Sequence, residues 1–139
     1  MKSMTGGAVL SFMLAVPDTP TAIDWYEKAL GAAVLWSLGS VAALQIDGSP
    51  FLLHEPVMPK FSSPTQIGTT TLRVELFVER PDEVIARALS AGATGGRIED
   101  HARPWGTHRQ GDFTDPFGHT WHVGDRSPLN WSSKPKPQK

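Results

Sequence analysis

The sequence carries two copies of one pattern, PTAIDWYEKALGA at residues 20–32 and PDEVIARALSAGA at residues 81–93. Each copy opens with proline, which is favoured in the first turn of a helix, and has glycine near its end, which favours a helix stop. Between these signals, apolar residues recur at helical spacing in both segments. The proline, the glycine and the alanine after it keep the same spacing, so the pattern predicts two related helices and a duplicated unit.

Strand-like runs flank both predicted helices in the same order. One run precedes each helix, at residues 9–16 and 70–78, and three shorter runs follow it. These shorter runs predict strands at 34–38, 41–46 and 51–54 in the first copy and at 97–102, 108–113 and 119–123 in the second. The predicted fold class is therefore α+β, built from tandem βαβββ modules.

This order of elements predicts one domain at residues 8–125. Its modules span residues 8–57 and 69–125 and are joined by a linker rich in proline and serine. Residues 1–7 are expected to form a flexible leader. Residues 132–139 are polar and rich in lysine and proline, and we expect a disordered tail there.

The composition excludes several classes of protein. The chain has 139 residues, of which 40% are hydrophobic and 19% are charged, which is ordinary for a globular protein. Thirteen basic residues against fourteen acidic ones argue against a nucleic-acid partner. The absence of cysteine excludes thiol nucleophiles and zinc–thiolate sites. No apolar run approaches the roughly 20 residues of a membrane span, so we expect a cytoplasmic protein with no membrane partner.

Three short motifs, taken together with the order of elements, resemble the vicinal oxygen chelate superfamily. That superfamily includes glyoxalase I, bleomycin-resistance proteins and extradiol dioxygenases. The motifs are WYEKALG at 25–31, WGTHR at 105–109 and FTDPFGHTWHV at 113–123. The resemblance covers residues 8–125 and implies a curled mixed sheet with helices on its convex side and a concave cavity. It also implies a homodimer.

Strand alternation on such a curled sheet sorts the side chains into two sets. Arg73, Glu75 and Phe77 are expected to point into the cavity, and His122 on the last strand likewise. In the first strand Met13 is expected on the cavity side. The helix side is expected to hold the bulky residues of that strand, Leu10, Phe12, Leu14 and Val16.

These positions define a candidate site. Arg73 is suited to hold a carboxylate, phosphate or carbonyl group of a ligand, and Glu75 and His122 are the candidate catalytic acid–base pair. The alternative is that Arg73 and Glu75 pair with each other. Aromatic rings can stack on flat ligands or pack in the core. The remaining ligand-binding candidates are Trp36, Trp105, Phe77, Met13 and Leu53. The other histidines, His101, His108 and His119, are expected to be exposed or to bond the local backbone.

Metal-dependent members of the superfamily carry one ligand on each of four strands. Matched by motif position, these ligands fall near Ser11, near Leu52 or Leu53, at Arg73 and at His122. Of these residues only His122 is a good ligand, and Arg73 would repel a divalent ion. We therefore expect no metal and no other cofactor. The alternative is a rearranged metal site formed by His122, Glu75 and His54.

The favoured function is metal-independent binding or sequestration of a small, partly aromatic organic molecule, as in antibiotic-resistance proteins of the superfamily. The alternative is an enzyme, namely a lyase, isomerase or oxygenase. Such an enzyme would use the rearranged metal site or acid–base chemistry by His122 and Glu75. The sequence leaves open whether the ligand is turned over.

Overall fold

The computed structural model describes residues 6–104 and 106–125. The chain divides into two compact units, residues 1–67 and 68–139, whose boundary falls inside the predicted linker. Among the described residues, no helix combines the length and apolar character needed to cross a membrane. Residues 1–5 of the expected leader and the whole of the expected tail lie outside the described residues.

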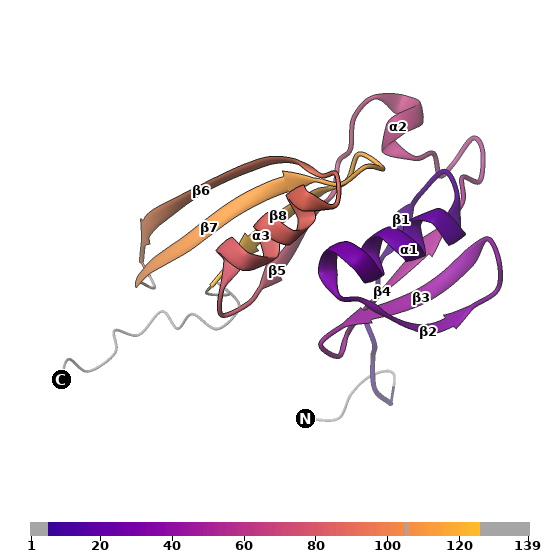
Figure 1. Cartoon of the computed structure of the whole chain (residues 1–139). Helices are drawn as coiled ribbons and strands as arrows, with labels where there is room; N and C mark the ends of the chain where they lie inside the picture. The colour runs from indigo at the N-terminus through magenta and orange to yellow at the C-terminus, as the bar shows by residue number, and fades with distance from the viewer. Residues whose placement is uncertain (1–5, 105, 126–139) are drawn as a thin grey trace. The chain divides into compact units, whose positions relative to one another are not determined.

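The first unit is a four-stranded mixed sheet with one long helix (Figure 1). Its strands stand in the order β1-β4-β3-β2, with β1 parallel to β4 and the other neighbours antiparallel. A short helix, which the sequence did not predict, follows in the linker. The elements are β1 (Met13–Ala15), α1 (Thr19–Leu30), β2 (Ala33–Ser37), β3 (Val41–Ile46), β4 (Ser49–His54) and α2 (Pro64–Ile67).

The second unit repeats this topology (Figure 1). Its strands stand in the order β5-β8-β7-β6, and again the first strand is parallel to the last. The elements are β5 (Arg73–Phe77), α3 (Pro81–Ser90), β6 (Thr94–Arg103), β7 (Gly106–Thr114) and β8 (Thr120–Gly124). The predicted α+β class with two βαβββ modules is confirmed.

Helix α1 begins and ends where local chemistry satisfies its backbone. The Thr21 N–H donates to Asp18 Oδ2 over 3.0 Å, which caps the first turn. Gly31 ends the helix in the left-handed conformation, at φ 65°, which costs glycine little. The buried face of α1 packs on the sheet, where the Tyr26 ring meets Phe51 of β4 edge-on at 5.5 Å.

The first strand is shorter than predicted. Its ladder with β4 reaches back to Phe12, whose carbonyl accepts from the Leu52 N–H over 3.0 Å. The next donor in a parallel ladder would be residue 50, which is proline and has no N–H. Among the described residues Leu10 therefore has no partner strand, and it is 96% exposed, so its predicted place facing the helix is wrong. Leu14 and Val16 are buried, as predicted.

Helix α3 packs directly on the second sheet at Gly111. A side-chain carbon at this glycine would lie 2.6 Å from Ile85 Cδ1, so helix and strand approach each other closely here. Beside this contact Trp121 stacks on Phe113 with their ring centres 6.0 Å apart, and both are buried. The apolar side of the second sheet thus packs against α3, and the opposite side carries mostly polar residues.

Candidate functional site

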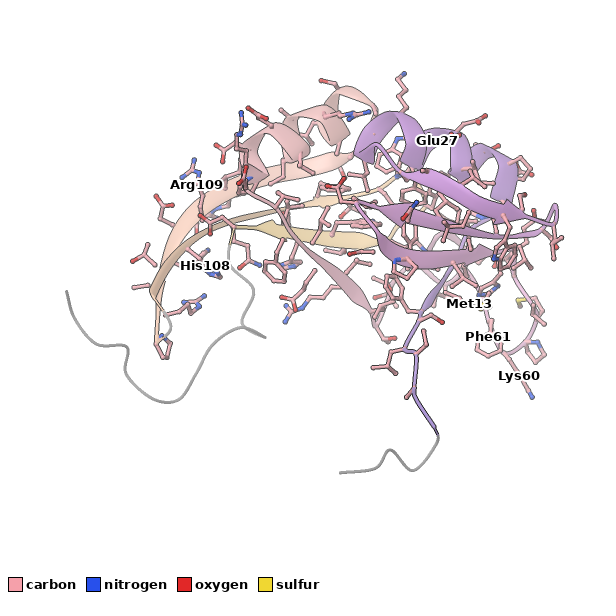
Figure 2. All side chains as sticks on the ribbon, turned by 90° about the horizontal axis from the view of Figure 1, so that it is seen from below. Met13, Glu27, Lys60, Phe61, His108 and Arg109 are labelled. Carbon is pink, nitrogen blue, oxygen red and sulfur yellow. The ribbon has the colours of Figure 1, made fainter. Side chains whose placement is uncertain are left out.

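The face of the second sheet opposite α3 is polar and hollowed. The hollow has a volume of about 430 Å³ and draws side chains from all four strands of the unit. Figure 2 shows neighbouring residues His108 and Arg109 on opposite sides of the β7 ribbon, with His108 on the hollow's side. The residues around the hollow are Arg73, Glu75, Phe77, Arg97, Glu99, His101, Arg103, His108, Gln110, Gly111, Asp112 and His122.

Arg109 braces the sheet from the other side. Its Nε donates to Asp82 of α3 over 2.8 Å, and its Nη1 lies 3.3 Å from Asp100 of β6. The hydrogen bond from Arg109 lowers the pKa of the Asp82 carboxyl, and the same carboxylates raise the pKa of Arg109. One guanidinium therefore links β7 to α3 and to β6, behind the hollow.

His122 lies on β8, an inner strand of the second sheet. It is aligned with Glu75 on β5 and with Asp112 on β7, so both carboxylates stand beside it on the same face. The side-chain nitrogen Nε2 of Gln110 lies 2.9 Å from His122 Nδ1. The imidazole is thus held on one edge by an amide and has a carboxylate residue on each neighbouring strand.

The turn before β8 fixes which way His122 points. Asp115 accepts hydrogen bonds from the N–H groups of Phe117 and His119 and from Trp121 Nε1, all within 3.0 Å. Binding Trp121 in this way anchors it on the α3 side, so its neighbour His122 must face the hollow. The His119 carbonyl also accepts from the Asp115 N–H over 2.9 Å, which closes the turn.

Positive and negative side chains around the hollow are equal in number, apart from the histidines. At the β6 edge the charges pair locally: Arg97 binds Glu99, and Glu99 also lies 3.9 Å from His101 Nε2. On β5 they do not pair. Within the described residues neither Arg73 nor Glu75 makes an ion pair, although they share a face. The structure therefore does not have the predicted alternative, an ion pair between Arg73 and Glu75. Arg73 is exposed.

Four of the predicted site residues come together around the hollow: Arg73, Glu75, Phe77 and His122. Three others, Met13, Trp36 and Leu53, belong to the first unit. Met13 and Trp36 are partly exposed there, with 45% and 43% of their surface accessible. Trp105 lies outside the described residues.

The expected place of Leu53 in a cavity is wrong. Leu53 is fully buried, and its register partner in the parallel ladder is Leu14, a core residue. Strand β4 contains three apolar residues in a row, so polarity does not show which of them faces the core. Pairing with β1 decides this, and Leu53 lies on the core side together with Phe51.

Strands β6 and β7 supply lining residues that the sequence analysis did not assign. These are Arg97, Glu99, His101, Arg103, His108, Gln110 and Asp112. The expectation of exposed histidines is wrong for His108, which is only 4% exposed, because β7 lies between β6 and β8 and the His101 ring packs 5.7 Å away. The missed signal is the alternation itself, since every second residue from 97 to 103 is charged or a histidine.

Two of the positions inherited from metal-dependent members hold no metal ligand in this chain. Among the inherited positions, Leu53 is in the core and Arg73 brings a positive charge to the hollow. His54, the third member of the rearranged alternative, belongs to the first unit and its Nδ1 bonds the carbonyl of Glu55 at 2.7 Å. Within the described part of the chain, no three histidine or acidic side chains are grouped as metal ligands.

The comparisons with known proteins match the greater part of the chain. A family model described as the glyoxalase/bleomycin resistance protein/dioxygenase superfamily matches residues 8–123. Uncharacterized proteins of Mycobacterium bovis and Mycobacterium tuberculosis are 39% identical to the chain over 126 residues. The matched region is 83% of this chain and 81% and 72% of those proteins.

Solved structures share the fold. TioX from Micromonospora sp. ML1 is 25% identical, with a TM-score of 0.63 over 86% of this chain and 97% of that one. The fosfomycin resistance protein FosX from Listeria monocytogenes, in a complex with Mn(II) and 1S,2S-dihydroxypropylphosphonic acid, is 16% identical. Its TM-score is 0.66 over 88% of this chain and 92% of FosX, a likeness of fold alone.

Proposed function

The chain belongs to the glyoxalase/bleomycin resistance protein/dioxygenase superfamily, and on that premise we propose that the hollow of its second unit binds a small, partly aromatic organic molecule without a metal. The observation that carries this proposal is Arg73, an exposed guanidinium on the wall of the hollow with no ion pair among the described residues. A guanidinium binds carboxylates and phosphates through paired hydrogen bonds.

The remaining walls suit such a molecule. Phe77, two residues along the same strand face, offers a ring against which a flat group can pack. Glu75 and His122 add polar contacts beside it. A volume of about 430 Å³ falls within the range of roughly 300–1,000 Å³ that is typical of small-molecule sites. The hollow therefore combines one anion-binding group, one aromatic wall and several hydrogen-bonding groups.

The test uses naphthalene-2-carboxylate as a probe, with binding measured by titration calorimetry on EDTA-treated protein. We expect Arg73→Ala to weaken binding about 10- to 100-fold, because a hydrogen bond to a charged group contributes roughly 1.5–3 kcal/mol. The same substitution should weaken the binding of the neutral naphthalene-2-carboxamide much less than that of the carboxylate. Arg80→Ala removes an exposed arginine that pairs with Glu83, outside the hollow, and should leave binding unchanged.

Three results would contradict the proposal. One is that the EDTA-treated protein does not bind any of a set of planar aromatic acids. Another is that added Mn²⁺ or Zn²⁺ is needed to restore binding. The third is that Arg73→Ala binds the carboxylate as tightly as the unaltered chain does.

An acid–base enzyme is the second candidate. It is favoured by the alignment of Glu75 with His122 across the β5–β8 pair, which places a carboxylate beside an imidazole on the hollow's wall. Loss of turnover in Glu75→Gln with binding retained would support this candidate over simple binding.

The homodimer and the cytoplasmic location also remain proposals. The dimer is supported by exposed apolar residues on β2, which stands at one end of the first sheet's strand order. They are Val34, Leu35 and Trp36, followed by Leu38 just beyond the strand.

A further inference from the structure

The contact between Gln110 and His122 determines which ring nitrogen of His122 can donate a hydrogen bond into the hollow. Gln110 Nε2 lies 2.9 Å from His122 Nδ1. In this orientation the amide nitrogen faces the ring and donates, so Nδ1 is the acceptor and the neutral ring carries no proton there. The proton of the neutral ring then lies on the other nitrogen, Nε2. Within the described residues Nε2 has no hydrogen-bond partner, and the ring lines the hollow.

We propose that Gln110 is a positioning residue that holds His122 in the Nε2–H tautomer. His122 then presents an N–H donor to the hollow, and the site selects molecules that place a carbonyl or carboxylate oxygen beside it. The preference for a ligand oxygen rests on the proposed function, whereas the tautomer of His122 is a property of the protein without ligand.

The position of Gln110 fits this role. It lies on β7, two residues before Asp112, the register partner of His122, so it reaches the ring diagonally across the β7–β8 pair. Glu75 and Asp112 also stand beside the ring, and their carboxylates can only accept. They are the competing explanation for the position of the proton, and the test must separate them from Gln110.

The test is a long-range ¹H–¹⁵N NMR spectrum of the full chain labelled with ¹⁵N-histidine. It is recorded without ligand at about pH 8. A His122→Asn spectrum identifies the signals of this ring. In the unaltered chain we expect Nε2 protonated and Nδ1 unprotonated, with no detectable second tautomer.

Two variants then separate Gln110 from the neighbouring carboxylates. Gln110→Glu replaces the amide donor by an acceptor of the same length and should reverse the tautomer to Nδ1–H. Gln110→Leu keeps the size but removes the hydrogen bond, so the second tautomer should become visible. Gln45→Glu makes the same change on β3 of the first unit and should leave the His122 signals unchanged.

Two results would overturn the assignment of the His122 tautomer. The first is an Nδ1–H tautomer in the unaltered chain, whatever the variants do. The second is a Gln110→Leu spectrum like that of the unaltered chain, because Glu75 and Asp112 would then determine which ring nitrogen of His122 carries the proton. If Gln110→Glu does not fold, the other two spectra decide. Failure of naphthalene-2-carboxylate to bind while the tautomer is as expected would count against the proposed function only.

Discussion

At the scale of single residues, Asp115 organises the last turn before the site. Asp115 is only 3% exposed, and its carboxylate accepts from two backbone N–H groups and from the indole of Trp121. A buried carboxylate that receives several hydrogen bonds stays compatible with an apolar surrounding. The Asp-Pro-Phe-Gly motif is therefore explained by the architecture of the turn, and its contribution to the hollow is indirect, through the direction of His122.

Replacing this carboxylate should cost much of the chain's stability. We expect Asp115→Ala to lower the free energy of unfolding by about 3 kcal/mol, because buried donors that lose their partner each cost roughly 1–3 kcal/mol. Urea denaturation followed by circular dichroism measures this. The control is Asp24→Ala on the exposed side of α1, expected to change stability by less than about 0.5 kcal/mol. Equal effects of the two substitutions would show that the turn does not depend on Asp115.

Sequence alone places some site residues and not others, for reasons that lie in the strands. Residues 73–77 alternate between polar or aromatic residues and aliphatic ones, so the sides of β5 can be predicted. Leu53 follows two other apolar residues, so only the pairing of β4 with β1 reveals its side. The contact between Gln110 and His122 crosses two strands and depends on their register, which no local pattern contains.

At the scale of elements, the cap of α1 makes part of its stability depend on pH. Two hydrogen bonds from Thr21, one from its hydroxyl and one from its N–H, lower the pKa of Asp18 from its ordinary 3.8. A carboxyl with a lowered pKa stabilises the folded chain above its unfolded value, and this contribution disappears as the pH falls through the folded value.

Asp18→Ala should therefore lower the urea midpoint at neutral pH, by less than Asp115→Ala does. As the pH falls below about 3.8, the difference between Asp18→Ala and the unaltered chain should shrink toward zero. Midpoints measured between pH 7 and pH 2.5 check this, with Asp24→Ala as the control. A difference that stayed constant over this range would rule out the carboxylate as the source of the cap's effect.

Helices are easier to predict than strand ends in this chain. Proline at the start and glycine or a turn at the end act within a few residues of each other, so both long helices are placed closely. The N-terminal limit of the first strand is set by its partner β4, because Pro50 has no N–H to continue the ladder. That limit lies far away in the sequence, so the apolar run at 9–16 gives no sign of it.

At the scale of the whole molecule, the exposed apolar residues of β2 predict self-association. Light scattering should give twice the chain mass of 15.1 kDa. Trp36→Glu would place a charge among the exposed residues of β2 and should shift the protein to the monomer. Lys28→Glu makes a charge change on the exposed side of α1 and should leave the mass unchanged. A monomeric unaltered chain would contradict the dimer.

Because β5 pairs with β8, the two ends of the second unit must meet before the hollow exists. Arg73 and Glu75 leave the ribosome well before His122, and during that interval β5 lacks its neighbour. Pairings between segments so far apart in the chain form slowly, since a long loop must close first. All four strands of the first sheet are therefore synthesised, by residue 54, before the hollow of the second unit can form. Synthesis interrupted before β8 would therefore yield a product with a complete first sheet and without the hollow.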